Sequence, residues 1–253
     1  MLRKLKDFII DQHLLEENKI ILFPNMGLGD QIMYNSRVNL YSDVFKYVIL
    51  CTHPKNLDMT KKMYSHKDNV IVYPLSHEKY WLNDKRGLDE SKFKDLCTFI
   101  NDLGCSFEFA RDINTYELRY NDIYVYRDLK KEQMMYDEIV AEVGPKYIVV
   151  NDDELRQIYL DDMKKSDYPE VHINLGTKSN RVGIERIKSL SNYIFDWVEV
   201  LKNAYEIHTF NSSFANVIDR LNIKAENGNY MYTDASNRVW EDQSHKKESF
   251  ILI

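Results

Sequence analysis

Three short apolar runs alternate with helix-compatible stretches near the start of the chain, and this order constrains the fold more than any other feature. The runs cover 19–23, 47–51 and 69–73. Each is apolar along almost its whole length, as is typical of a strand that is buried on both faces. Helix-compatible patterns at 31–40 and 56–66 separate the runs. This alternation predicts a right-handed, parallel α/β sheet.

A second pattern of the same kind follows an irregular, charged and aromatic stretch at 76–130. A helix is predicted at 128–143, and Gly144-Pro145 ends it. Beyond that point, we expect strands at 147–150, 171–175 and 206–210 and helices at 194–202 and 212–221. A further amphipathic helix is predicted at 2–18, whereas the stretch from 222 onward is not assigned. The expected organisation is two α/β domains, 1–145 and 146–253.

The composition disfavours several classes of protein. Hydrophobic residues make up 44% and charged residues 29% of the 253 positions, as in soluble globular proteins. The 34 basic and 40 acidic residues give a net charge of −6, so nucleic acid is disfavoured as a partner. No apolar run approaches the roughly 18 residues of a membrane span, and the first residues do not fit a signal peptide. The three cysteines form no CxxC pair, so we expect a reducing, cytoplasmic location without a cysteine metal site.

The first candidate site is the glycine-rich turn after the first predicted strand. Two of the eight glycines, Gly27 and Gly29, precede Asp30 there. Glycine allows a positive φ and lets a ligand approach the backbone closely, and the next helix offers free N–H groups. Ile32 replaces the third glycine of a dinucleotide fingerprint, so that match is poor. The alternative is that Asp30 only caps the helix. The substrate-binding candidates in this turn are Gly27, Leu28, Gly29 and Gln31.

The second candidate site is the end of the predicted strand at 206–210 and the helix start that follows it. Hydroxyl groups at the positive end of a helix suit a phosphate, although either serine here would also serve as a plain helix cap. Glu206 and His208 alternate onto one side of the strand, where a lone histidine is more often structural than functional. The candidates for binding the donor are Glu206, His208, Asn211, Ser212, Ser213 and Phe214.

The third candidate site follows the predicted strand at 147–150. Asp152 lies in its acidic turn, and the guanidinium of Arg156 matches the geometry of a diphosphate. Arg181 is a second cationic candidate. Asp152 and Asp153 could together hold a divalent metal, but the sequence shows no ligand cluster with metal spacing beyond this pair, so we expect no metal site. Sites at strand ends in two α/β halves suggest a ligand held in a cleft between domains.

Several motifs resemble those of GT-B glycosyltransferases of the heptosyltransferase and fucosyltransferase-like type. They are GLGDQI at 27–32, FEFARDINTYELRYNDIYVYRDLKKE at 107–132, YIVVNDDELR at 147–156 and IFDWVEVLKNAYEIHTFNSSFANVIDRL at 194–221. The last two look like the nucleotide-sugar-binding half of such enzymes, particularly of glycosyltransferase-like proteins from bacteria and large viruses. The resemblance covers most of 19–222.

The resemblance implies a compact pair of Rossmann-like domains that face a cleft. The acceptor, a glycan or glycoconjugate, would bind mainly to the first domain and the nucleotide-sugar donor mainly to the second. Catalysis would need no metal and no cofactor besides this donor, and Asp30 would be the catalytic base. The location would be cytoplasmic, in the host cytoplasm if the protein is viral. The Asp-Thr-Gly donor motif of heptosyltransferases is absent, so the donor sugar does not carry over.

Two alternatives belong to other functional classes. One is a non-catalytic nucleotide- or sugar-binding protein of the same fold, which would bind donors without turnover. The other is a nucleotide-sugar-modifying enzyme such as an epimerase, which is disfavoured because the dinucleotide fingerprint is incomplete.

Overall fold

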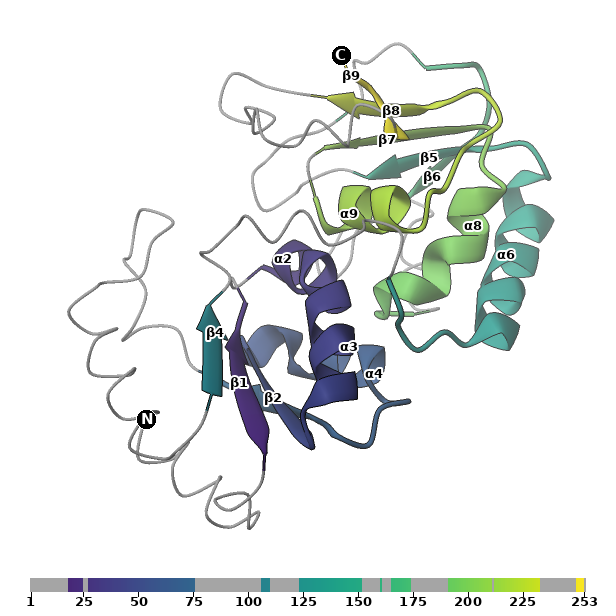
Figure 1. Ribbon diagram of the computed structural model, residues 1–253. Coiled ribbons are helices and arrows are strands. Elements are labelled where there is room, and N and C mark those ends of the chain that lie inside the picture. Colours follow the sequence, from purple (N-terminus) through teal and green to yellow (C-terminus); the bar gives the residue numbers. More distant parts are fainter. Residues whose placement is uncertain are drawn as a thin grey trace. The chain divides into compact units, whose positions relative to one another are not determined.

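The structure is a computed structural model. It describes residues 18–24, 27–75, 106–109, 123–151, 160, 165–173, 191–210, 212–232 and 249–252. The chain divides into two compact units, 1–126 and 127–253, and each has its own parallel sheet (Figure 1). The α/β class with parallel strands is therefore confirmed. The helix expected at 2–18 lies outside the described residues.

The first unit is built around a parallel sheet whose described strands have the order β3-β2-β1-β4. Its strands are β1 (Lys19–Phe23), β2 (Tyr47–Thr52), β3 (Val70–Pro74) and β4 (Ser106–Phe109). Its helices are α2 (Leu28–Met33), α3 (Asn35–Val44), the 3₁₀ helix η1 (Pro54–Asn56) and α4 (Leu57–Met63). All five residues of β1 are buried, and α3 packs on β2 while α4 packs on β3. The three apolar runs thus become β1, β2 and β3, as predicted.

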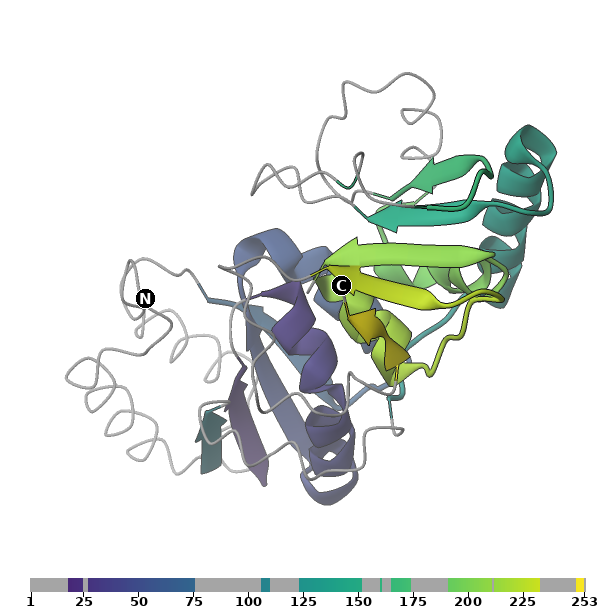
Figure 2. The same ribbon diagram turned by 90° about the horizontal axis from the view of Figure 1, so that it is seen from above.

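The second unit has a parallel sheet whose described strands have the order β6-β5-β7-β8-β9. Its strands are β5 (Ile148–Asn151), β6 (Glu170–His172), β7 (Glu206–Phe210), β8 (Asn229–Tyr232) and β9 (Ile251–Leu252). Its helices are α6 (Leu129–Val143), the 3₁₀ helix η3 (Ile194–Trp197), α8 (Val198–Lys202) and α9 (Ser213–Arg220). Figure 1 shows α6, α8 and α9 on one face of this sheet, and Figure 2 shows β9 at its edge beside β8.

The division between the units falls between Tyr126 and Arg127, earlier than the expected boundary at 145/146. The reason is that α6 packs on η3 and α8 and so belongs to the second unit. Lys131 of α6 forms an ion pair with the fully buried Asp196 of η3 at 3.2 Å. Glu132, also buried, pairs with Arg127. Gly144-Pro145 ends the helix, as predicted, but does not separate the units.

Each sheet contains a point where the strand order reverses. In the first unit it lies between β1 and β4, and in the second between β5 and β7. Open parallel sheets bind ligands outside the carboxyl ends of their strands at such points. Both strand orders are compatible with Rossmann-like folds. The carboxyl ends of β1, β5 and β7 are therefore the positions where a ligand-binding site is expected.

Within the described residues, no helix is long and apolar enough to cross a lipid bilayer.

Candidate functional site

The turn after β1 differs from the expected one because the helix begins earlier. Leu28, Gly29 and Asp30 form the first turn of α2 and do not belong to a preceding loop. Asp30 is the third helical residue, and its Oδ2 accepts a hydrogen bond from the N–H of Gly27 at 3.0 Å. Asp30 thus stabilises the helix start from inside the first turn rather than as the N-cap. Its side chain is exposed, and Gln31 beside it is buried.

Gly27 has an ordinary extended backbone conformation and lies close to the Asp30 carboxylate. Its φ of −76° and ψ of 153° are open to any residue, so the expected positive φ is wrong at this position. A Cβ atom on Gly27 would lie 2.9 Å from Oδ2 of Asp30. A residue larger than glycine would therefore require the Asp30 carboxylate to shift slightly.

A polar cluster joins the carboxyl ends of β5 and β7 at the reversal point of the second sheet. Oδ1 of Asn151 accepts hydrogen bonds from the hydroxyl groups of Thr209 at 3.0 Å and Ser212 at 2.7 Å. Nδ2 of Asn151 donates to the carbonyl of Ile173, just beyond β6, at 2.9 Å. Because the amide nitrogen is committed to Ile173, the amide oxygen must face the two hydroxyls. One buried amide therefore positions the start of α9.

Ser212 and Ser213 have different roles at the start of α9. Ser212 is the N-cap, and its Oγ accepts a hydrogen bond from the N–H of Ala215 at 3.4 Å while it donates to Asn151. Ser213, the first helical residue, is half-buried. The first N–H groups of a helix have no partners within the helix, so an anion can bind there. The other candidates, Asp152, Asp153, Arg156, Arg181 and Asn211, lie outside the described residues.

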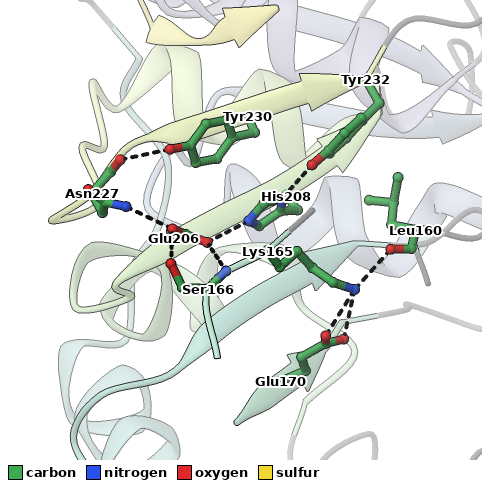
Figure 3. Close-up of polar contacts among 9 residues, drawn as sticks. All are labelled: Leu160, Lys165, Ser166, Glu170, Glu206, His208, Asn227, Tyr230 and Tyr232. Atoms are coloured by element: carbon green, nitrogen blue, oxygen red, sulfur yellow. Dashed lines mark hydrogen bonds and ion pairs between the residues drawn. The ribbon is translucent and has the colours of Figure 1, made fainter. Parts of the chain in front are cut away.

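The opposite face of β7 carries a buried polar network that sequence analysis found only in part (Figure 3). Oε1 of Glu206 accepts hydrogen bonds from Oγ of Ser166 at 2.5 Å and Nδ2 of Asn227 at 2.8 Å. Oε2 accepts from the backbone N–H of Ser166 at 3.1 Å and Nε2 of His208 at 3.0 Å. Nδ1 of His208 is 2.7 Å from the hydroxyl of Tyr232. Glu206 and His208 do share one side of the strand, as predicted.

The network holds Glu206 as an anion and His208 as a neutral imidazole. Burial raises the pKa of the Glu206 carboxyl, but the hydrogen bonds from Ser166, His208 and Asn227 outweigh it and lower the pKa to about 2. Burial lowers the pKa of His208, and the bond to Glu206 offsets part of that effect. Both carboxylate oxygens and both ring nitrogens therefore have protein partners, which favours a structural role over direct contact with a donor.

Stability should fall on acidification because of these two groups. A group whose pKa is depressed in the folded state stabilises it above the ordinary pKa and loses that contribution as pH falls. We expect the urea midpoint to decrease below pH 6.5 as His208 is protonated, and again from pH 4.5 to about 2 as Glu206 is protonated. A midpoint that stays constant from pH 8 to pH 3 would contradict this assignment.

Among the described residues, no three His, Cys, Asp or Glu side chains lie close enough to hold a metal ion. No protein-family model matches the chain, and no curated protein is significantly similar to it.

Proposed function

We propose that the chain is a glycosyltransferase of GT-B architecture that moves a sugar from a nucleotide-diphosphate sugar to an acceptor hydroxyl. The observation that carries this proposal is the Asn151–Thr209–Ser212 cluster, which holds the start of α9 at the reversal point of the second sheet. That is where parallel α/β sheets bind phosphate-containing ligands. Two parallel sheets in one chain support the proposed pair of Rossmann-like domains.

In this proposal, the donor diphosphate binds at the first turn of α9. The hydroxyl of Ser213 and the N–H groups of Ser213 and Phe214 donate to it, and Arg156 neutralises its charge. Ser212 does not donate to the diphosphate, because its hydroxyl proton is directed at Asn151, but it caps α9 and so positions the first turn of the helix. Stabilising the charge that develops on the departing diphosphate would be the largest catalytic effect.

The acceptor side of the proposal is the turn after β1. The Asp30 carboxylate is exposed at the carboxyl end of β1 and is oriented by the N–H of Gly27. A carboxylate held in one orientation suits a general base that takes the proton of an acceptor hydroxyl. Gly27, Leu28, Gly29 and Gln31 would shape this side of the site.

Donor binding is tested by the change Ser213→Asp. An acidic residue in the first turn interacts favourably with the helix dipole, so we expect the variant to be as stable as the wild type or slightly more stable. Its carboxylate would repel a diphosphate. UDP or GDP at about 100 times its dissociation constant should stabilise the wild type by about 2.7 kcal/mol and raise its melting temperature by several degrees. The same ligand should leave the melting temperature of Ser213→Asp unchanged.

The matched control is Ser36→Asp, the same change at another half-buried serine in the first turn of a helix, the second residue of α3. It should retain the full response to the nucleotide. If neither nucleotide shifts the wild type, or if Ser213→Asp responds as strongly as the wild type, the phosphate site is not at α9.

Transfer should not require a divalent metal, because the proposed leaving-group site uses N–H groups, a hydroxyl and an arginine instead. We expect the rate of sugar transfer from the active donor to remain within about twofold in excess EDTA. Complete loss of transfer, restored by Mn²⁺ or Mg²⁺, would refute this prediction.

One observation favours the alternative of a non-catalytic nucleotide- or sugar-binding protein. The Asp30 carboxylate accepts the N–H of Gly27, a contact that a purely structural helix cap would also make. Assaying transfer and hydrolysis with a panel of nucleotide sugars separates the two functions. Binding without turnover would support the alternative.

A further inference from the structure

The buried network of Figure 3 determines the position of every proton around His208. An ionised Glu206 can only accept hydrogen bonds, so Nε2 of His208 must carry the hydrogen of their 3.0 Å contact. A neutral imidazole has one N–H, and Nδ1 is therefore an acceptor. The hydroxyl of Tyr232 must donate to it across 2.7 Å. The pair thus depends on one tautomer of neutral His208.

A proton taken up by His208 would affect its two contacts in opposite ways. The contact with Glu206 would become an ion pair and strengthen. At Nδ1, an N–H would face the O–H of Tyr232, and two donors cannot bond to each other. Val150, Leu160 and Phe210 share a buried cluster with Tyr232 and are apolar. They offer no side-chain acceptor to which the hydroxyl could turn.

We propose that His208 is a proton-controlled latch, which ties Tyr232 at the carboxyl end of β8 to β7 while neutral and releases it when protonated. Tyr232 is the last residue of β8 and pairs with Phe210, the last residue of β7. Release would loosen the carboxyl end of β8, whereas the amino end would stay anchored through Glu206 to Ser166 and Asn227. This latch goes beyond the proposed function, because it requires no nucleotide and no reaction.

The groups that face His208 agree with this reading. From β7 and β8, Glu206 accepts its N–H, and Tyr230 stacks on its ring at 4.8 Å between centroids. Near β6, Lys165 opposes protonation and Glu170 favours it, and these two residues form an ion pair with each other at 2.9 Å. On β5, Val150 pairs with His208 and is apolar. Among these described neighbours, the hydroxyl of Tyr232 is therefore the group whose hydrogen bond to His208 would be broken by protonation.

The test is an NMR titration of the ¹⁵N-labelled imidazole in the full chain, without ligand. The wild type should show the Nε2–H tautomer at pH 8 and a protonation midpoint below that of a free histidine. Tyr232→Phe should raise this midpoint by up to about one pH unit, a tenfold gain in proton affinity, because the bond that favours neutral His208 is lost. Tyr230→Phe is the matched control. Its hydroxyl donates to the carbonyl of Asn227, so its loss should leave the midpoint unchanged.

If Tyr232→Phe does not fold, a second variant tests the latch. His208→Gln can still donate to Glu206 and accept from Tyr232 but cannot be protonated. The protection factor of the Tyr232 amide, which is the exchange rate corrected for its intrinsic pH dependence, should fall below the midpoint in the wild type and stay constant in His208→Gln. The latch is overturned by an Nδ1–H tautomer at pH 8, by a midpoint that Tyr232→Phe leaves unchanged or lowers, or by equal acid sensitivity of wild type and His208→Gln. Unfolding before His208 is protonated would also overturn it.

Discussion

Asp30→Asn is expected to lower the rate of sugar transfer by about 10²–10⁴-fold, the usual contribution of a general base. The fold should be unaffected, because the amide oxygen of asparagine can still accept the N–H of Gly27 that Asp30 now accepts at 3.0 Å. Both kcat and kcat/KM should fall, and the dissociation constant of the donor should change little, since the base acts on the acceptor. Steady-state kinetics and nucleotide titration on the same preparation measure these effects.

The matched control is Asp58→Asn, which removes an exposed carboxylate from the first turn of α4. It should leave transfer within about twofold of the wild type. If transfer by Asp30→Asn also stays within a few-fold, then Asp30 is only a helix-capping residue. The melting temperature of Asp30→Asn should equal that of the wild type. If stability and activity fall together, the loss of activity comes from a disrupted start of α2 and not from the loss of a general base.

Glu206→Gln is expected to reduce the free energy of unfolding at pH 7 by roughly 3 kcal/mol. The depression of the Glu206 pKa from 4.5 to about 2 corresponds to that order of magnitude. Glutamine replaces one acceptor oxygen with an NH₂ group, which would face donors from Ser166, His208 or Asn227. A buried donor left facing another donor is costly, so the substitution is severe despite its similar volume. Urea denaturation monitored by circular dichroism measures the change.

Glu226→Gln provides the comparison, because Glu226 is exposed and its contact with Lys146 is long, 3.9 Å. The same change there should alter stability by less than about 0.5 kcal/mol. Glu206→Gln should also weaken the acid dependence of stability between pH 4.5 and about 2, because the contribution of Glu206 is removed. A loss below 1 kcal/mol, or an unaltered acid dependence, would show that the buried carboxylate is not the anion inferred here.

Strands β1 and β2 could be predicted because their sequences are apolar along almost their whole length. The apolar runs at 19–23 and 47–51 became β1 and β2 almost residue for residue, and the strand predicted at 206–210, which mixes polar and apolar residues, became β7. The strands at 229–232 and 251–252 were not predicted, since the first mixes polar and apolar residues and the second is only two residues long. Strand β4 lies in a stretch without a clear period, which gave no signal in the sequence.

The helix start at Leu28 could not be predicted from the glycine-rich turn, because two glycines disfavour a helix. The bond from Gly27 to Asp30 outweighs that preference locally. The network around Glu206 could be anticipated only as far as Glu206 and His208, which are two residues apart. Ser166 and Asn227 come from 40 and 21 residues away, and no local pattern joins them to the strand.

The two polar clusters on β7 also bear on how the strand finds its partners during folding. All five of its residues are buried, so hydrophobicity alone cannot distinguish the correct alignment from one displaced by a single residue. A shift of one position would turn Glu206 and His208 away from Ser166, Asn227 and Tyr232, and would take Thr209 from Asn151. Buried polar atoms on both faces would then lose their partners at once. These hydrogen bonds therefore favour the native register of β7 over a register shifted by one residue.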